Sequence, residues 1–322
     1  SHTAYSWATW NRAESRVLTS GCDKTDANHS CMQSSIRIWD AASGEELARA
    51  ENHFVLISQA TWNQDESRIL TATCDEIDSY AQCMRGSARI WDAASGRELV
   101  HTHGQQAYVT QAIWNQQEDR FLTLENDGTV RIWNAQNGEM LVEVESNHEF
   151  IFRAIWSQDE SRILTGSSDG TARIWDASSG KELIRMDGQA GEVSQAMWNQ
   201  DESLVLTVMG EEGIVIVWDA TSGNELVRMQ GETGAVIEAS WNQDESRILA
   251  YTPSGMIWIW DAASGIALVR LEGHTGNARQ AMWSQDEQHI LSGSTDGTVR
   301  IWDLQSGNEA ISLKGHTDAI YQ

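Results

Sequence analysis

The chain is short of several residue types, and each shortage excludes a class of protein. Pro253 is the only proline in 322 residues, and no low-complexity linker marks a domain boundary. Basic residues are scarce: 22 Lys and Arg face 47 Asp and Glu, giving a formal charge of −25. Nucleic-acid phosphates and anionic lipid surfaces both require a cationic face, so we expect neither as a partner. No apolar run is long enough to span a membrane, and no signal peptide is visible, so we expect a cytoplasmic location.

Tryptophan, by contrast, is abundant and periodic. Fourteen of the 16 tryptophans form two series of seven. The first series is Trp10, Trp62, Trp114, Trp156, Trp198, Trp241 and Trp283. The second is Trp39, Trp91, Trp133, Trp175, Trp218, Trp260 and Trp302, each followed by Asp except Trp133, which precedes Asn134. Steps of 52, 42, 42, 43, 42 and 42 residues in the second series indicate a repeat architecture.

Residues 148–188 illustrate one unit. Four short segments, 150–156, 162–166, 171–175 and 182–186, are apolar or alternate, and each is near the usual length of a strand. Runs of Ser, Asp, Gln and Gly separate them, which is typical of hairpin turns. No segment sustains a helical apolar period over ten residues. The sequence therefore predicts an all-β protein whose units are four-stranded antiparallel meanders, with strands a, b, c and d in chain order.

A unit of about 40 residues cannot bury its own apolar face, so the units must pack on one another. Seven such sheets predict a closed seven-bladed β-propeller that occupies residues 1–322 as a single domain. Residues 315–322 resemble the start of a further strand a. This segment is either the seam of the ring or a partial repeat.

The units resemble the WD-repeat β-propeller family over essentially the whole chain, and the regularity of the repeats resembles that of bacterial members. In that family a His, a Ser or Thr, an Asp and the strand-c Trp form a hydrogen-bonded quartet. The last unit matches completely, with His274, Ser292, Asp296 and Trp302. We expect a structural role for this quartet. Other units depart from it at Gln105, His148, Gln189, Glu232 and Ser254, and Trp258 replaces an Arg that most units carry.

The two ends of each sheet differ in how much they vary between units. The a–b and c–d turns lie at one end and are acidic, as at Asp159-Glu160; this predicts either a solvated rim or a docking rim for a basic partner. At the other end, the resemblance implies that variable residues at the start of strand a contact a partner. These residues are Tyr108, Phe150, Phe152, Ile237, Asn277 and Arg279. Packing between blades is the alternative role.

All four cysteines lie in the b–c loops of the first two units. Cys22 and Cys31, and Cys74 and Cys83, each form a Cys-x8-Cys pattern. Disulfides, free thiols and a zinc site built from both loops remain alternatives, although the spacing is wrong for a zinc site within one loop. Disulfides would favour an oxidising compartment over the cytoplasm.

The resemblance implies a non-catalytic protein–protein interaction scaffold or recognition module. The partner would be a protein or peptide, and we expect the domain to be monomeric and to form part of a larger bacterial signalling or defence protein. The alternative is a small-ligand or metal-binding propeller that uses the channel mouth and the Cys loops. No catalytic motif or metal-spaced His cluster is present, so we expect no enzymatic activity, no cofactor and no metal. His101 and His103 lie near the end of a strand d, with no third ligand suggested.

Overall fold

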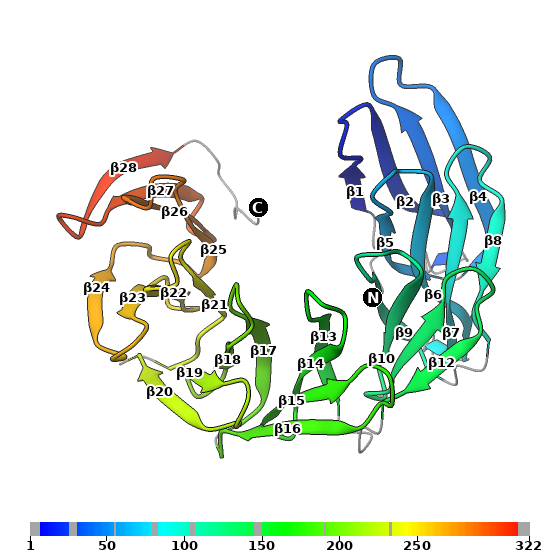
Figure 1. Ribbon diagram of the computed structural model, residues 1–322. Coiled ribbons are helices and arrows are strands. Elements are labelled where there is room, and N and C mark those ends of the chain that lie inside the picture. The colour runs from blue at the N-terminus through cyan, green and yellow to red at the C-terminus, as the bar shows by residue number, and fades with distance from the viewer. Residues whose placement is uncertain are drawn as a thin grey trace. The chain divides into compact units, whose positions relative to one another are not determined.

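The computed structural model describes residues 7–25, 31–54, 56–78, 83–103, 107–144, 150–189, 191–231 and 234–314. Within these ranges the chain forms seven four-stranded antiparallel sheets. In each sheet, consecutive strands are hydrogen-bonded neighbours, so every sheet is a meander (Figure 1). No helix long and apolar enough to cross a membrane is found in this part of the chain. The predicted seven-bladed β-propeller is confirmed.

Each blade takes four successive strands. Blade one has β1 (Trp7–Trp10), β2 (Arg16–Thr25), β3 (Cys31–Asp40) and β4 (Glu46–Phe54). Blade two has β5 (Leu56–Trp62), β6 (Arg68–Ile77), β7 (Cys83–Asp92) and β8 (Glu98–His101). Blade three has β9 (Val109–Trp114), β10 (Arg120–Glu125), β11 (Val130–Asn134) and β12 (Met140–Glu143). Blade four has β13 (Ile151–Trp156), β14 (Arg162–Ser167), β15 (Thr171–Asp176) and β16 (Glu182–Asp187).

The last three blades follow the same plan. Blade five has β17 (Val193–Trp198), β18 (Leu204–Met209), β19 (Ile214–Asp219) and β20 (Glu225–Gln230). Blade six has β21 (Glu238–Trp241), β22 (Arg247–Tyr251), β23 (Ile257–Asp261) and β24 (Ala267–Leu271). Blade seven has β25 (Ala278–Trp283), β26 (His289–Ser294), β27 (Thr298–Asp303) and β28 (Asn308–Lys314). Residues 315–322, the predicted seam or partial repeat, lie outside the described residues.

The chain divides into two compact units. The first is Ser1–Arg162 with Asp176–Lys181, and the second is Ile163–Trp175 with Glu182–Gln322. Blades one to three thus belong to the first unit and blades five to seven to the second. The prediction that the whole chain is one domain stays a prediction.

The apolar core lies between neighbouring blades. Leu18 and Ile36 of blade one pack in one cluster with Ile57, Ile69 and Trp91 of blade two. Equivalent clusters join blade two to three, five to six, and six to seven. The sheets of blades two and six are therefore apolar on both faces, and their core is shared with their neighbours.

The outer strand of each blade is supported by the c–d turn of the next one. Gly96, at the turn between β7 and β8, has a φ of +70°. This value lies in the left-handed region, which glycine adopts much more readily than other residues. A Cβ atom at this position would lie 2.1 Å from the carbonyl oxygen of Arg49 in β4. This close approach explains why the turn ends in Ser-Gly, and it shields part of the outer edge strand.

Candidate functional site

The predicted quartet forms in blade seven. Trp302 Nε1 donates to Ser292 Oγ at 2.8 Å, and His274 Nε2 lies 2.8 Å from the same hydroxyl. Because the Asp296 carboxylate can only accept, the neutral His274 ring donates from Nδ1–H to Asp296 Oδ2 at 3.0 Å, and Nε2 accepts the Ser292 hydroxyl proton. Burial lowers the pKa of His274, so the ring is neutral in this arrangement.

Ser292, His274 and Asp296 are in the order of a hydrolase triad, but the geometry cannot serve catalysis. The His274 side chain has no exposed surface and Ser292 is 1% exposed. The Ser292 oxygen that would act as a nucleophile also accepts the Trp302 indole proton. A substrate has no access to this hydroxyl, so the network satisfies buried polar groups.

Among the described residues, five other blades form the inner half of the quartet. The strand-c Trp donates to a strand-b Thr at 2.8–3.0 Å, in the pairs Trp39–Thr19, Trp91–Thr71, Trp133–Thr123, Trp175–Thr165 and Trp218–Thr207. Of the residues at the His place, Gln105, His148 and Glu232 lie outside the described residues. Gln189 is exposed, and Ser254 contacts Thr252 Oγ1 at 2.8 Å.

A strand-c Arg makes a second network that the sequence did not reveal. In blade two, Arg89 contacts Asp75 at 3.0 Å and Glu98 at 3.6 Å. Blades one, three, four and seven repeat this acid–Arg–acid arrangement, through Asp23–Arg37–Glu46, Glu125–Arg131–Glu143, Asp169–Arg173–Glu182 and Asp296–Arg300–Glu309. The arginine ties strand c to the b–c turn and to strand d. Its recurrence at one position of the repeat was the signal.

The acidic a–b rim has a structural role that neither sequence interpretation anticipated. The Glu of every a–b turn adopts a positive φ: Glu14, Glu66, Glu118, Glu160, Glu202, Glu245 and Glu287 lie between +54° and +60°. Glu160 of blade four accepts from Asn115 Nδ2 at 2.8 Å, Gln117 N at 2.9 Å and Arg120 Nη2 at 3.2 Å, all in blade three. Glu66, Glu118, Glu245 and Glu287 reach the preceding blade in the same way. These side chains fasten blades together.

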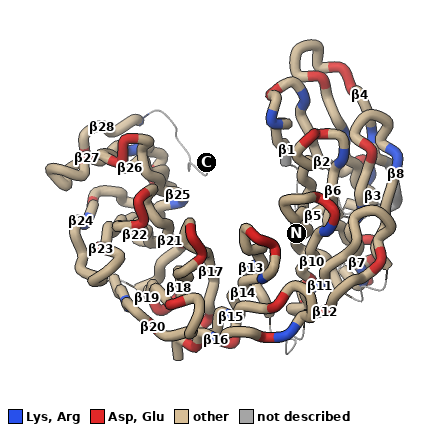
Figure 2. The backbone as a smooth tube through the Cα atoms, viewed as in Figure 1, with Lys and Arg blue, Asp and Glu red and all other residues tan. Residues whose placement is uncertain are grey.

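The neighbouring aspartates act within their own turns. Asp159 accepts from Ser157 Oγ and Ser161 Oγ at 2.7 Å and from Ser161 N at 3.0 Å. These hydrogen bonds lower the pKa of Asp159 to about 2. Figure 2 shows acidic positions at the turns that join β13 to β14 and β17 to β18. Much of the negative charge of this rim is therefore already engaged.

The first tryptophan series takes part in the same joint. Arg16 of blade one stacks over Trp62 of blade two, with its guanidinium carbon 4.8 Å from the ring centroid. Arg68–Trp114, Arg120–Trp156 and Arg247–Trp283 repeat the contact at 4.9, 5.6 and 5.3 Å. Each Arg thus bridges a Trp and a Glu of the following blade. Cation–π contacts of this kind contribute about 0.5–1 kcal/mol each at partly exposed sites.

At the opposite end of the sheets, a β-bulge lies at the second variable position of strand a. The register shifts at Ser58, Thr110, Ser194 and Arg279. The three hydroxyls donate back to strand b, to Ala72, Leu124 and Val208 carbonyl oxygens at 3.0–3.1 Å. Arg279 has no hydroxyl and is exposed. A β-bulge changes the direction in which a side chain points. A residue at this position that does not donate to a strand-b carbonyl oxygen can therefore point away from the sheet.

Two predicted contact residues come together in blade four. Phe150 and Phe152 are 43% and 38% exposed, and their rings meet edge to face with centroids 4.9 Å apart. Tyr108 of blade three is half-buried, and its backbone exchanges hydrogen bonds with Asn126 at 2.9 Å. An aromatic pair that stays exposed is a feature of interaction surfaces.

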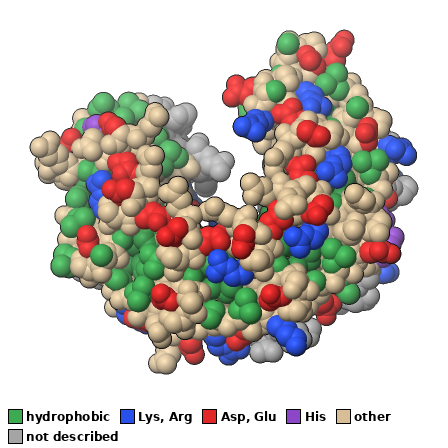
Figure 3. Space-filling model, in the orientation of Figure 1, with side chains coloured by type: hydrophobic (Ala, Val, Ile, Leu, Met, Phe, Trp, Pro, Cys, Tyr) green, Lys and Arg blue, Asp and Glu red, His purple; other side chains and the backbone are tan. Residues whose placement is uncertain are grey.

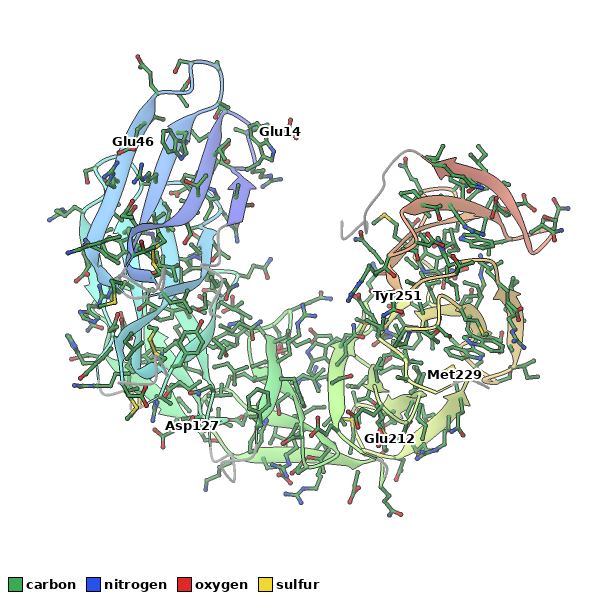
Figure 4. The ribbon with its side chains drawn as sticks, turned by 180° about the vertical axis from the view of Figure 1, so that it is seen from behind. Glu14, Glu46, Asp127, Glu212, Met229 and Tyr251 are labelled. Carbon is green, nitrogen blue, oxygen red and sulfur yellow. A yellow bond between two sulfur atoms is a disulfide. The ribbon has the colours of Figure 1, made fainter. Side chains whose placement is uncertain are left out.

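The other predicted contact residues lie in blades six and seven. Ile237 is 37% exposed, and Asn277 and Arg279 are exposed. Buried Tyr251, labelled in Figure 4, donates to Glu238 Oε2 at 2.6 Å and lies 3.2 Å from the Arg279 carbonyl oxygen. This hydroxyl joins the start of strand a in two adjacent blades.

Both Cys-x8-Cys loops contain a disulfide. Cys22–Cys31 and Cys74–Cys83 have Cα atoms 5.8 and 5.9 Å apart, and yellow bonds mark them in Figure 4. No free cysteine occurs among the described residues, so neither loop offers a thiolate to a metal. The aspartate after the first Cys of each loop, Asp23 or Asp75, takes the turn-Asp place in the arginine network.

Glu125 of blade three is the acid of the arginine networks whose pKa is raised. Its side chain has no exposed surface, and within the described residues Oε2 has no hydrogen-bond partner. Burial raises the pKa of Glu125 to about 7, although contact with Arg131 opposes this shift. The carboxyl therefore gains or loses its proton near neutral pH.

Comparisons with known proteins agree with this architecture. The family model described as "WD domain, G-beta repeat" matches residues 97–134, 140–176 and 265–303. The computationally designed Ika8 protein is similar in structure, with a TM-score of 0.71 and 19% identity over 97% of this chain and 87% of that one. The C-terminal WD40 domain of Sif2 also has a TM-score of 0.71, with 17% identity over 98% and 88%. None of the curated protein sequences matches the chain. The chain is a seven-bladed β-propeller, and three of its segments match the WD-repeat family model.

Proposed function

We propose that the chain is a recognition module that binds a protein or peptide through variable residues at the start of strand a. The exposed Phe150–Phe152 pair carries this proposal. Blades two, three and five fill the second variable position with a hydroxyl that bonds back to its own sheet. Blade four places Phe152 there and leaves it 38% exposed. An aromatic side chain in this position is costly to solvate unless a partner covers it.

Apart from the start of strand a, the described residues of the blades form a repeated structural framework. Many of its polar groups take part in the Trp–Thr pairs, the arginine networks and the Glu joints, which hold the backbone fixed. A rigid scaffold with variable residues at one end is the usual basis of a binding surface. In Figure 3, acidic side chains spread over the visible face with basic ones among them. The charge of −25 favours a partner that carries Lys or Arg.

Peptides selected from a displayed library provide the test. We expect Phe150→Ala/Phe152→Ala to weaken binding of a selected peptide at least about tenfold, since aromatic anchors dominate such surfaces. Leu183→Ala is the matched control, because Leu183 is an equally apolar side chain, 49% exposed, on the outer strand of the same blade. Equal binding by the Phe variant and the wild type would remove this surface from the proposal.

The wider setting of the module is also a proposal. Near-identical repeats support a place in a larger bacterial signalling or defence protein, with the propeller as a monomeric recognition part. The two disulfides support an oxidising compartment rather than the cytoplasm. Thiol titration of protein purified under alkylating conditions separates these locations, because a cytoplasmic protein would yield free thiols.

A further inference from the structure

A polar pocket of about 310 Å³ lies at the loop end of blade two, beside the Cys74–Cys83 hairpin. Its charged and titratable lining comes from the b–c hairpin and from the end of strand d: Asp75, Glu76, Arg85, Arg89, His101 and His103. The arginine network uses Asp75 and Arg89. The two histidines have no part in the quartet or in the Glu joints described above.

The histidines are arranged as a pair. His101 is the last residue of β8, and His103 follows two positions later. Their ring centroids are 4.3 Å apart and the planes are tilted by 47°. Rings this close can reach one metal ion, with each nitrogen at about 2.0–2.1 Å, only at adjacent coordination positions.

The surroundings favour a cation bound to neutral imidazoles. Glu98 Oε1 lies 3.8 Å from His101 Nδ1, on the side that orients a histidine whose other nitrogen holds a metal. Around the pair, the carboxylates of Asp75, Glu76 and Glu98 outnumber the two arginines Arg85 and Arg89.

We infer that His101 and His103 form a two-imidazole site for a divalent transition metal of the Cu²⁺, Ni²⁺ and Zn²⁺ class. Imidazole selects these borderline ions over Mg²⁺ and Ca²⁺, which prefer oxygen ligands. No set of three His, Cys, Asp or Glu side chains in the described ranges is grouped tightly enough to hold a metal. Water therefore completes the coordination, and the site is an exchangeable one. The inference is independent of peptide binding at the start of strand a.

Calorimetric titration of tag-free protein with Cu²⁺ and Zn²⁺ tests the site. We expect one equivalent of Cu²⁺ to bind more tightly than Zn²⁺, following the Irving–Williams order, and Mg²⁺ not to compete. His101→Ala and His103→Ala should each weaken binding at least about tenfold, because loss of a ligand exceeds the effect of losing a supporting group. His289→Ala is the control, since His289 also lies near two carboxylates, at 3.7 and 3.9 Å, but has no partner imidazole in its ion-pair contacts.

A spectroscopic measurement separates a real site from general attraction to an acidic protein. Electron paramagnetic resonance of the Cu²⁺ complex should show coupling to two imidazole nitrogens, reduced to one in either single variant. Circular dichroism checks that the variants are folded. Unchanged affinity in the His101→Ala/His103→Ala double variant would overturn the inference. The inference would also be overturned if Glu76→Gln abolished Cu²⁺ binding while the double His variant still bound the ion.

Discussion

Glu160 offers the sharpest test of how the blades are joined. Its side chain is only 4% exposed, and it accepts three hydrogen bonds from Asn115, Gln117 and Arg120 in the preceding blade. Its φ of +59° places a non-glycine residue in the left-handed region. A glutamate that served only solubility would need neither a buried, hydrogen-bonded carboxylate nor a positive φ.

The cost of Glu160→Ala follows from these contacts. A hydrogen bond to a charged group contributes about 1.5–3 kcal/mol, and removal of one partner of a buried ion pair costs about 3–5 kcal/mol. Since alanine has the same difficulty with a positive φ, the backbone term cancels. We therefore expect a loss of about 3–5 kcal/mol in the free energy of unfolding. Glu160→Gly should lose about 1 kcal/mol less, because glycine tolerates the left-handed conformation.

Urea unfolding, followed by tryptophan fluorescence, measures this loss. A double-mutant cycle with Asn115→Ala should give a coupling energy of at least about 1 kcal/mol, because the two side chains share a direct hydrogen bond. Glu45→Ala in an exposed c–d turn is the matched control and should change stability by less than about 0.5 kcal/mol. If Glu160→Ala behaves like Glu45→Ala, or the coupling is zero, the joint between the blades is not where the structure places it.

Three further outcomes follow from buried groups. Glu125 has a folded-state pKa of about 7 against 4.5 when unfolded, so its contribution to stability is present below pH 4.5 and is lost as pH rises to 7. Glu125→Gln should therefore gain up to about 3 kcal/mol relative to the wild type between pH 4.5 and 8 in urea titrations, and a constant difference would contradict this. His274→Ala should cost about 2–4 kcal/mol because it leaves buried hydroxyl and carboxylate groups unpaired, whereas His289→Ala should be nearly neutral in the same assay. Cys74→Ala/Cys83→Ala should cost about 2–3 kcal/mol in thermal melts, and reductant should then lower the wild-type Tm further than that of the variant.

The blades could be predicted from the sequence because their signals are local. In blade four the expected strands 150–156, 162–166, 171–175 and 182–186 differ by one residue at most from β13, β14, β15 and β16. The spacing of the Trp series predicted the length of the repeat, and the short Ser-Gly turns predicted the positions of the hairpins. Three strands extend one residue past the predicted segment, as at Ser167 and Asp176, and β13 begins one residue later, at Ile151.

The joints between blades could not be predicted in the same way. Glu160 and Asp159 are adjacent acids in a polar turn, and the sequence alone predicts the same role for both, in an acidic rim. The structure separates them: Asp159 bonds within its turn, and Glu160 bonds to the preceding blade. The difference depends on a positive φ at a non-glycine residue, which no residue type announces. Only the recurrence of Glu at one position in every unit hinted at it.

Blade six shows why departures from a repeat must be considered together. Trp258 replaces the network Arg, and Ala250 stands opposite it where other blades have Thr or Ser. The small residue makes room for the indole, which stacks parallel to Trp260 with centroids 5.9 Å apart. The acids of the network are missing as well, since Ser254 and Ala267 occupy their places. Well-packed apolar groups often replace a buried ion pair without loss of stability, provided that no charge is left behind. Four substitutions that each look like a lost contact are therefore one exchange of a polar network for an aromatic stack, so the departures from the quartet do not by themselves make blade six less rigid.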